Sequence, residues 1–242
     1  MVTIVSDARA DSTVMARPSL VVELVGPAGS GKTTLFRALS QRNQRVVKGA
    51  RPRVRRIGHI PFFARNTISL LPTLLRLHQN GRWFTRQEVG MLARLNGWHY
   101  VLTRQASRSE RIIVVDQGPV FLLSWLAEFG PESLKGQSSQ DWWDSMVKQW
   151  AAVLDVVICL DAPDSVLTER INRRGKRHTV KGRPEQEMRA FLARGRTSVD
   201  ETISRLTASG GPTVLVFDTA LESPGKIAEK VLASLGLAPS DE

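Results

Sequence analysis

Residues 20–34 read LVVELVGPAGSGKTT, an apolar run followed by a glycine-rich loop. The loop fits the pattern GxxxxGK[ST] from Gly26 to Thr33, which is typical of a P-loop that follows a strand and opens a helix. Glycines allow backbone N–H groups to surround phosphate oxygens, Lys32 can reach the β- and γ-phosphates, and the Thr33 hydroxyl can bind Mg²⁺. The stretch predicts a site for a nucleoside triphosphate, with an ordinary glycine turn as the alternative.

Strands and helices are predicted to alternate along the chain. Apolar runs indicate strands at residues 20–25, 44–48, 111–116, 153–160 and 213–218. Apolar side chains at helical spacing indicate helices at residues 31–42, 66–79, 85–108, 119–129, 139–151, 184–208 and 224–235, with one more after Pro163 and an irregular connection over 49–65. This order predicts an α/β fold of three layers, with a central five-stranded parallel sheet, helices on both faces, and ligands at the carboxyl ends of the strands.

Composition favours one globular domain without covalent cross-links. A chain of 242 residues, 42% of them hydrophobic, can bury one large core. The single cysteine, Cys159, excludes a disulfide framework and a cysteine-rich metal site. No apolar run approaches the ~20 residues that span a bilayer, and residues 1–18 are too polar for a signal peptide. We therefore expect a cytoplasmic protein with no membrane partner.

Positive charge is concentrated in one segment. The formal net charge is +11, yet no acidic residue occurs between Glu23 and Glu88, where 13 of the 34 Lys and Arg residues fall. The rest of the chain carries 21 basic and 23 acidic residues and is nearly neutral. Such a field attracts phosphates, carboxylates or polyanions. A solvated basic face with no ligand beyond the triphosphate is the alternative.

Three aspartates stand at the ends of predicted strands. Asp116 closes the strand at 111–116, where P-loop proteins commonly hold a carboxylate near the metal and the attacking group. It can orient Mg²⁺ through water or accept a proton from an acceptor hydroxyl, with capping of the helix after Pro119 as the alternative. Asp161 and Asp218 each precede a helix start, which favours capping or structural roles for both.

A basic stretch that begins at Arg170 predicts a lid. Arg170 and Arg174 are four residues apart, so a helix presents both guanidinium groups on one face, where they can hold a polyphosphate. Arg173 and Arg177 form an alternative pair one step around the helix. Two neighbouring glycines suit a flap that closes over the nucleotide and excludes water. The alternative is a basic helix that is exposed to solvent and binds no nucleotide.

The chain resembles the nucleoside and nucleotide kinases of the P-loop class, above all the thymidylate-kinase-like members. The resemblance covers residues 20–236 in outline and rests on four short pieces: residues 26–34, Asp-Gln-Gly at 116–118, Arg-Ile-Asn-Arg-Arg-Gly-Lys at 170–176, and Val-Phe-Asp at 216–218. It implies that the P-loop holds phosphates and Mg²⁺, that the arginines and Lys176 form a lid, and that the chain after Asp218 passes near the adenine.

These patterns give a predicted organisation and site. Residues 1–18 form a flexible N-terminal tail and residues 19–238 a P-loop kinase domain, in which 49–108 form an acceptor-binding insertion and 170–184 the lid. The predicted catalytic residues are Lys32, Asp116, Arg170 and Arg174. The predicted cofactor-binding residues are Gly29, Ser30, Gly31, Lys32, Thr33, Thr34, Lys176 and Asp218, and the predicted metal ligands are Thr33 and Asp116.

Two departures from the family leave the acceptor open. Thymidylate and deoxynucleoside kinases usually carry an arginine after the acid of the third strand, where this chain has Gln117. They also have an acidic residue near the end of the second strand, where this chain offers Lys48, Arg51 and Arg53. Either the acceptor is not an ordinary nucleoside or nucleoside monophosphate, or its site has been rebuilt.

The region at 49–108 combines arginines with aromatic residues, which can hold an anionic ring-bearing molecule by ion pairing and stacking. The predicted substrate-binding residues are Arg53, Arg55, Phe63, Arg65 and Gln117. Trp98 recurs at helical spacing with Leu95 and Leu102 and is predicted to be a core residue, as are Trp142, Trp143 and Trp150.

The leading functional hypothesis is a small-molecule kinase that uses ATP and Mg²⁺ to phosphorylate a hydroxyl or phosphate of an unidentified, anionic acceptor. Lys32 and the lid arginines would neutralise developing charge, and Asp116 would organise the metal or the nucleophile. One alternative is a non-catalytic nucleotide-binding switch, although no Asn-Lys-x-Asp guanine-reading motif occurs. Another is a P-loop NTPase or kinase that acts on nucleic acid through the arginine-rich residues 42–65. A homodimer is compatible with the sequence.

Overall fold

A parallel β-sheet forms the centre of the computed structural model, which describes residues 3–4, 19–53, 56–78, 82–108, 110–173, 175 and 182–237. Its five parallel strands are β2 (Leu20–Val25), β3 (Val46–Lys48), β4 (Ile112–Asp116), β5 (Val156–Asp161) and β6 (Thr213–Asp218). A two-residue strand, β1 (Thr3–Ile4), pairs antiparallel with β6, so the order is β1-β6-β5-β2-β4-β3. The predicted five-stranded parallel sheet is confirmed.

The strand that leads into the P-loop lies in the middle of the sheet. Every residue of β2 is buried, as expected for a parallel strand covered on both faces. Its neighbours are β4 on one side and β5 on the other. From β2 the chain continues to β3 and β4 on one side of β2 and then to β5 and β6 on the other side. The order of the strands therefore reverses beside β2. Open α/β sheets bind their ligands at such a reversal.

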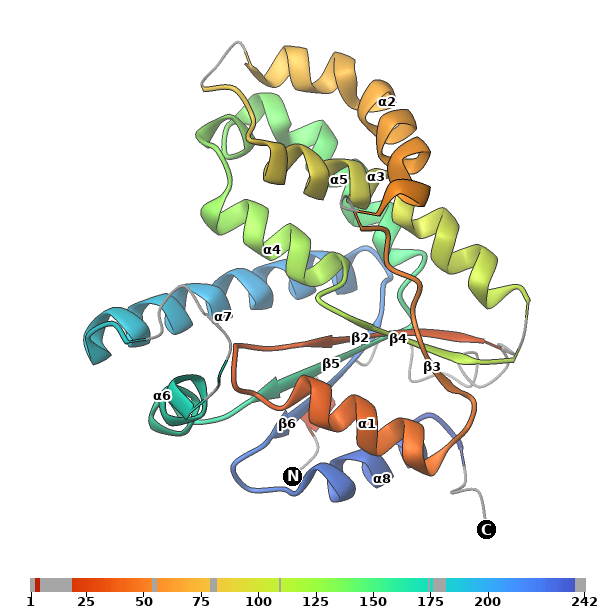
Figure 1. Ribbon diagram of the computed structural model, residues 1–242, viewed down its shortest axis with the longest axis vertical. Coiled ribbons are helices and arrows are strands. Elements are labelled where there is room, and N and C mark those ends of the chain that lie inside the picture. Colours follow the sequence, from red (N-terminus) through yellow and green to blue (C-terminus); the bar gives the residue numbers. More distant parts are fainter. Residues whose placement is uncertain are drawn as a thin grey trace.

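Helices cover both faces of the sheet (Figure 1). Two helices, α1 (Lys32–Arg42) and α8 (Pro224–Ser234), pack on one face. The opposite face carries the other large helices, which are α3 (Arg86–Ala106), α4 (Pro119–Phe129), α5 (Gln140–Ala151) and α7 (Glu185–Ala208). Two elements extend from these layers: α6 (Asp164–Arg173), beside the P-loop, and α2 (Ile60–His78), which packs on α3. The predicted three layers are therefore present.

The helix α2 begins earlier than the sequence predicts. Residues 49–65 were expected to be irregular, but a 3₁₀ turn, η2 (Ile57–His59), leads directly into α2, so that prediction is wrong for residues 57–65. Pro61 stands in the first helical turn, where proline costs no hydrogen bond. Pro72 lies inside the helix on its exposed side, while Phe63 and three leucines on the opposite side are buried. Burial against α3 therefore outweighs the helix-breaking tendency of Pro72.

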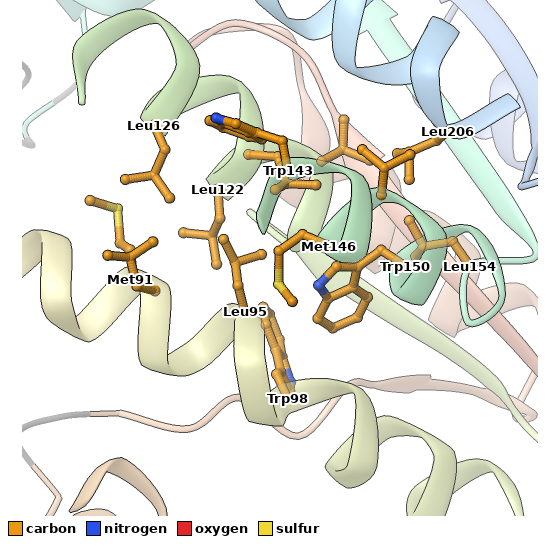
Figure 2. Packing of buried hydrophobic residues seen from close by; sticks show 14 of the residues in the cluster. Met91, Leu95, Trp98, Leu122, Leu126, Trp143, Met146, Trp150, Leu154 and Leu206 are labelled. Atoms are coloured by element: carbon orange, nitrogen blue, oxygen red, sulfur yellow. The ribbon is translucent and has the colours of Figure 1, made fainter. Parts of the chain in front are cut away.

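A cluster of apolar side chains from α2, α3, α4, α5 and α7 covers one face of the sheet, and Figure 2 shows part of it. Trp98 of α3 and Trp150 of α5 are both fully buried, and their rings meet edge to face with centroids 6.3 Å apart. The Trp98 Nε1 donates a hydrogen bond to the Ala50 carbonyl at 2.6 Å, which ties the segment after β3 to this core. Trp142 and Trp143 are also buried. The four tryptophans are core residues, as predicted.

Candidate functional site

The P-loop, residues 26–34, has the geometry that its glycines require. Gly26 and Gly31 have φ angles of +135° and +88°, a region that favours glycine. A side chain at Gly26 would also collide with the carbonyl of Leu160 in β5. The loop leads into α1, whose first turn contains no acidic residue. The positive end of the α1 dipole is therefore available to an anion.

Lys32 lies across this loop. Its Nζ donates hydrogen bonds to the carbonyl oxygens of Gly26 at 2.7 Å and Pro27 at 2.9 Å. The next two residues, Thr33 and Thr34, are exposed in the first turn of α1. An ammonium group held by carbonyl oxygens can exchange them for phosphate oxygens, which are stronger acceptors. The arrangement suits the predicted contact with the β- and γ-phosphates.

A pocket of about 370 Å³ opens beside the P-loop. Ligand sites commonly have volumes of ~300–1,000 Å³. The walls come from the P-loop, α1, α6 and the turn between β6 and α8, and they include Gly31, Thr34, Arg170, Arg173, Thr219 and Pro224. Asp218 itself accepts a hydrogen bond from the Ala220 N–H at 2.7 Å through Oδ1. It shapes the turn whose next residue, Thr219, lines the pocket.

Arg170 joins the P-loop to this turn. Its guanidinium donates to Thr219 Oγ1 at 2.9 Å, to the Thr219 carbonyl at 3.0 Å and to the Gly29 carbonyl at 3.3 Å. Arg173 also lines the pocket and pairs with Glu169 at 2.7 Å. The described part of α6 therefore brings two arginines to the pocket. The other predicted lid residues, Arg174 and Lys176, lie outside the described residues.

Asp116 ends β4 beside the strand that carries the P-loop. The parallel register pairs it with Leu24, two residues before Gly26. Its Oδ1 is buried and has no hydrogen-bond partner among the described residues. The N-terminal N–H groups of α4 are not capped by Asp116, because Glu23 accepts hydrogen bonds from two of them. Asp116 therefore does not cap α4, and its buried oxygen still lacks a polar partner in the described part of the chain.

Glu23 is a structural residue that the sequence analysis missed. It is fully buried in β2, and its carboxylate accepts hydrogen bonds from the N–H groups of Val120 at 2.9 Å and Phe121 at 3.1 Å. Burial raises the pKa of Glu23 to about 8; the backbone hydrogen bonds oppose this rise, and the nearby Asp116 adds to it. The signal in the sequence was a lone charged residue in an otherwise apolar strand.

A second group of side chains lies next to Asp116, on the segment after β3 and on α3. The Arg51 Nη1 donates to Gln117 Oε1 at 3.3 Å, and Gln117 has an unusual φ of +55° for a residue other than glycine. Arg94 of α3 donates from Nε to the Pro52 carbonyl at 3.1 Å, and its guanidinium carbon lies 5.8 Å from the centre of the Phe63 ring. Two arginines and one aromatic ring thus converge near the end of β4.

These two arginines are partly desolvated. Burial and the positive charge of Arg51 lower the pKa of Arg94 to about 10, so Arg94 stays charged at neutral pH. Burial also lowers the pKa of Arg51, and the Asp116 carboxylate opposes this effect. Neither arginine forms an ion pair with a carboxylate in the described part of the chain. An anionic ligand would supply the missing charge.

The predicted substrate-binding residues are only partly brought together. Phe63 and Gln117 belong to this group, and Arg53 lies close to Arg51, with its own N–H donating to His59 Nδ1 at 2.8 Å. Arg65 is exposed on α2, and Arg55 lies outside the described residues. Arg51 and Arg94 themselves were not among the predicted site residues.

Asp161 has the structural role that its position favours. The Arg196 guanidinium of α7 donates to Asp161 at 2.7 and 3.1 Å and to Asp164 at 2.6 Å. The Asp161 carbonyl accepts the N–H of Thr219 at 2.8 Å. Asp161 therefore links α6, α7 and the turn after β6, which together frame the pocket. Arg196 was another residue that the sequence did not single out.

The comparisons with known proteins agree with this geometry. A family profile described as AAA domain matches residues 21–198. The chain belongs to the AAA domain family. Together with the fold, this match confirms the predicted membership of the P-loop nucleotide kinase superfamily. The narrower likeness to thymidylate kinases stays a prediction.

Solved structures similar to this AAA domain include kinases. A deoxyadenosine kinase from M. mycoides with bound dATP superimposes with a TM-score of 0.50 at 15% identity, covering 88% of this chain and 100% of that one. A tunicamycin resistance protein from Deinococcus radiodurans has a TM-score of 0.47 at 17% identity, with coverages of 93% and 99%. A shikimate kinase from Acinetobacter baumannii in complex with shikimate has a TM-score of 0.43 at 18% identity, with coverages of 92% and 95%. A search of curated proteins finds no match.

The residues of this AAA domain fit a magnesium nucleotide. Within the described ranges, no group of three or more His, Cys, Asp or Glu side chains can hold a metal ion on its own. The exposed Thr33 and the unpartnered Asp116 Oδ1 are the protein oxygens that suit the ion. Protein-bound Mg²⁺ commonly keeps several waters and takes its other ligands from substrate phosphates and one or two carboxylates. The small number of protein ligands is therefore in keeping with such a complex.

Proposed function

We propose that this protein is an ATP- and Mg²⁺-dependent phosphotransferase whose acceptor is a small molecule with a hydroxyl or phosphate nucleophile and an anionic group. The observation that carries the proposal is the unpartnered Asp116 Oδ1, which lies beside the P-loop strand and near the desolvated guanidinium of Arg51. Donor and acceptor groups would thus meet at the carboxyl ends of β2 and β4.

On the donor side, Lys32 and the α1 N-terminus hold the β- and γ-phosphates of ATP. The pocket between α6 and the turn after β6 accepts the remainder of the nucleotide. Arg170 keeps the two walls of this pocket together, and its guanidinium can donate to phosphate oxygens as they gain charge. Thr33 and Asp116 would hold Mg²⁺ together with the phosphates, and the ion would supply charge neutralisation.

On the acceptor side, Arg94 and Arg51 bind the anionic group and orient the acceptor. With a hydroxyl acceptor, its oxygen forms a bond to the γ-phosphorus as the bond from that phosphorus to the β–γ bridging oxygen breaks. The hydroxyl proton passes to the Asp116 carboxylate, and ADP leaves. Gln117, which accepts from Arg51, fixes the direction of that guanidinium. Most of the rate enhancement in such a reaction comes from positioning and charge stabilisation.

A screen for acceptor-dependent ADP formation tests the proposal. The acceptors are hydroxylated carboxylates, sugar phosphates and nucleoside monophosphates, each with its uncharged analogue, and the nucleoside monophosphates also test the narrower thymidylate-kinase likeness. Lys32→Ala is the control for contaminating kinases. We expect turnover with one anionic class and none with its uncharged analogue. No acceptor-dependent turnover in this panel, or equal turnover by Lys32→Ala, would overturn the proposal.

A pair of arginine variants then tests the acceptor site. Arg94→Gln should raise the KM for the acceptor by about 10- to 150-fold, because a charge-assisted hydrogen bond contributes ~1.5–3 kcal/mol. The KM for ATP should stay nearly constant. The matched control is Arg56→Gln, an exposed arginine that precedes η2. Equal effects of both changes would contradict the role of Arg94.

A further inference from the structure

The helix α2 has a second apolar face, which is exposed and lies beside the face that packs on α3. Ile60, Ile68, Leu71 and Leu75 on α2 are 54%, 69%, 44% and 51% exposed, and Ile57 in the preceding 3₁₀ turn is 83% exposed. The adjoining side of the helix buries Phe63 and three leucines. We call these five exposed residues the outer face of α2. Isolated exposed apolar residues are ordinary, whereas a row of five along one element marks an interaction surface.

The spacing makes this face continuous. Steps of three or four residues from 57 to 75 keep side chains on one side of a helix, and Ala64 fills the step between 60 and 68. From Ile60 to Leu75 the row is about 22 Å long at 1.5 Å per residue. Figure 1 shows α2 at the top of the molecule, farthest from the sheet. The outer face is therefore a long, narrow apolar strip at one end of the fold.

The charges beside this strip distinguish between partners. Arg65 lies on the edge of the strip and Arg56 precedes it; both are exposed and have no carboxylate partner in the described part of the chain. Arg76, also on the edge, meets the exposed Asp141 at 3.5 Å. A two-fold dimer through this face would bring the like charges of two copies together. A negatively charged partner would be attracted instead.

We propose that the outer face of α2 binds the surface of a membrane that contains anionic lipids. A helix with an apolar strip and flanking arginines lies in the plane of a bilayer with its apolar side chains below the headgroups. Trp83 follows α2 and is 47% exposed, and its ring meets His78 edge to face at 4.4 Å. Tryptophan favours the headgroup region, so it would strengthen contact at this end of the strip.

This inference goes beyond the phosphotransfer reaction and does not depend on it. Among the described residues, none of the helices is long and apolar enough to cross a bilayer. The expectation of no membrane partner followed from the absence of a spanning segment in the sequence, but a helix that lies on the surface requires none. Such binding would be reversible and would weaken at high salt, because the attraction between arginines and anionic headgroups is screened.

Vesicle sedimentation of the full-length protein tests the inference, without nucleotide or acceptor. The probes are vesicles of phosphatidylcholine alone and vesicles that also contain phosphatidylglycerol. The variant Ile68→Glu/Leu71→Glu changes two exposed residues of the outer face. The matched control is Leu221→Glu, which changes a leucine that is 82% exposed in the turn after β6. Circular dichroism and thermal unfolding verify that each variant is folded.

We expect the wild type and the Leu221 variant to sediment with the anionic vesicles and much less with phosphatidylcholine. The double variant should lose at least about tenfold in partitioning, which corresponds to ~1.4 kcal/mol. Arg65→Glu should also weaken binding to the anionic vesicles. Absence of wild-type binding, or equal binding by the double variant, would overturn the inference. So would a concentration-dependent dimer that the double variant abolishes in the absence of lipid, since the face would then be an interface between copies.

Discussion

Replacement of the buried Glu23 by glutamine should change the pH dependence of stability. In the folded protein, Glu23 lies in the centre of β2 and accepts hydrogen bonds from the N–H groups of Val120 and Phe121. Its pKa is raised from 4.5 to about 8, chiefly by burial. The carboxyl group is therefore mainly protonated near pH 7, and the glutamine amide is close to it in shape and charge.

The size of the effect follows from the two pKa values. A group whose pKa rises on folding binds its proton more tightly in the folded state, so its contribution to stability is complete below about pH 4.5 and is lost as the pH rises to about 8. Each pH unit in this window corresponds to about 1.4 kcal/mol, which gives a total on the order of 5 kcal/mol. A glutamine at position 23 does not titrate, so its contribution to the free energy of unfolding does not change over this pH range.

Urea unfolding of both proteins at about pH 5 and about pH 8 measures the difference. At the lower pH, Glu23→Gln should be less stable than the wild type, by ~1–3 kcal/mol, because the amide nitrogen cannot accept the backbone N–H that a carboxyl oxygen accepts in the wild type. At the higher pH the order should reverse, with the variant more stable. Other titrating groups are common to both proteins and cancel. An equal stability difference at both pH values would refute the reasoning, because Glu23 would then be ionised throughout.

Three further substitutions test other parts of the structure. Lys32→Ala should abolish phosphoryl transfer in a coupled ADP assay with little change in the unfolding temperature, because the Nζ contacts its own loop; normal turnover would contradict the donor site. Arg170→Ala should weaken ATP binding about tenfold or more by calorimetry, since it frees the turn after β6, whereas Arg189→Ala on the surface of α7 should not. Trp98→Phe should lower the free energy of unfolding by ~1–3 kcal/mol through a lost hydrogen bond and a small cavity, and Trp83→Phe by less than ~0.5 kcal/mol.

The fold is predictable from the sequence wherever one local signal decides it. The strands at 20–25 and 111–116 stand out because residues buried on both faces of a sheet are nearly all apolar, with Glu23 the exception inside the first strand. The start of α2 is not predictable in this way. Pro72 looks like a helix breaker in the sequence, and only the packing of Phe63 and three leucines on the buried side shows why the helix continues through it.

The donor half and the acceptor half of the candidate site also differ in how far they can be predicted from the sequence. The donor half is encoded in consecutive residues of the P-loop, so its spacing alone predicts the geometry. The acceptor half joins side chains that are far apart in the chain: Arg94 bonds to Pro52, 42 residues earlier, and Arg51 to Gln117, 66 residues later. Arg94 was missed because an arginine on a helix is ordinary in sequence, and only the position of α3 gives it a role.

The basic residues of the segment 24–87, which contains no acidic residue, differ in their surroundings. Among the described residues, three of its arginines are seen paired with acids, all of which lie outside the segment. These pairs are Arg42 with Glu229, Arg76 with Asp141 and Arg82 with Glu88. Because the side chains in them are largely exposed, apart from the buried Glu88, most contribute little stability. The positive charge that matters for ligands is therefore smaller than the sequence count suggests and is more sharply localised.

Arg51 and Arg94 differ from these surface arginines in their desolvation, which the nearby Asp116 carboxylate offsets only in part at Arg51. Burial lowers the pKa of both, and each faces the positive charge of another arginine. Their charge therefore costs free energy in the protein without a ligand, and an anionic acceptor would recover that free energy on binding. A neutral acceptor of the same shape would leave both guanidinium groups unpaired, as a site built for a polar group leaves its own partners unpaired with the wrong substrate. The same side chains thus provide both the affinity for an anionic acceptor and the discrimination against its uncharged analogues.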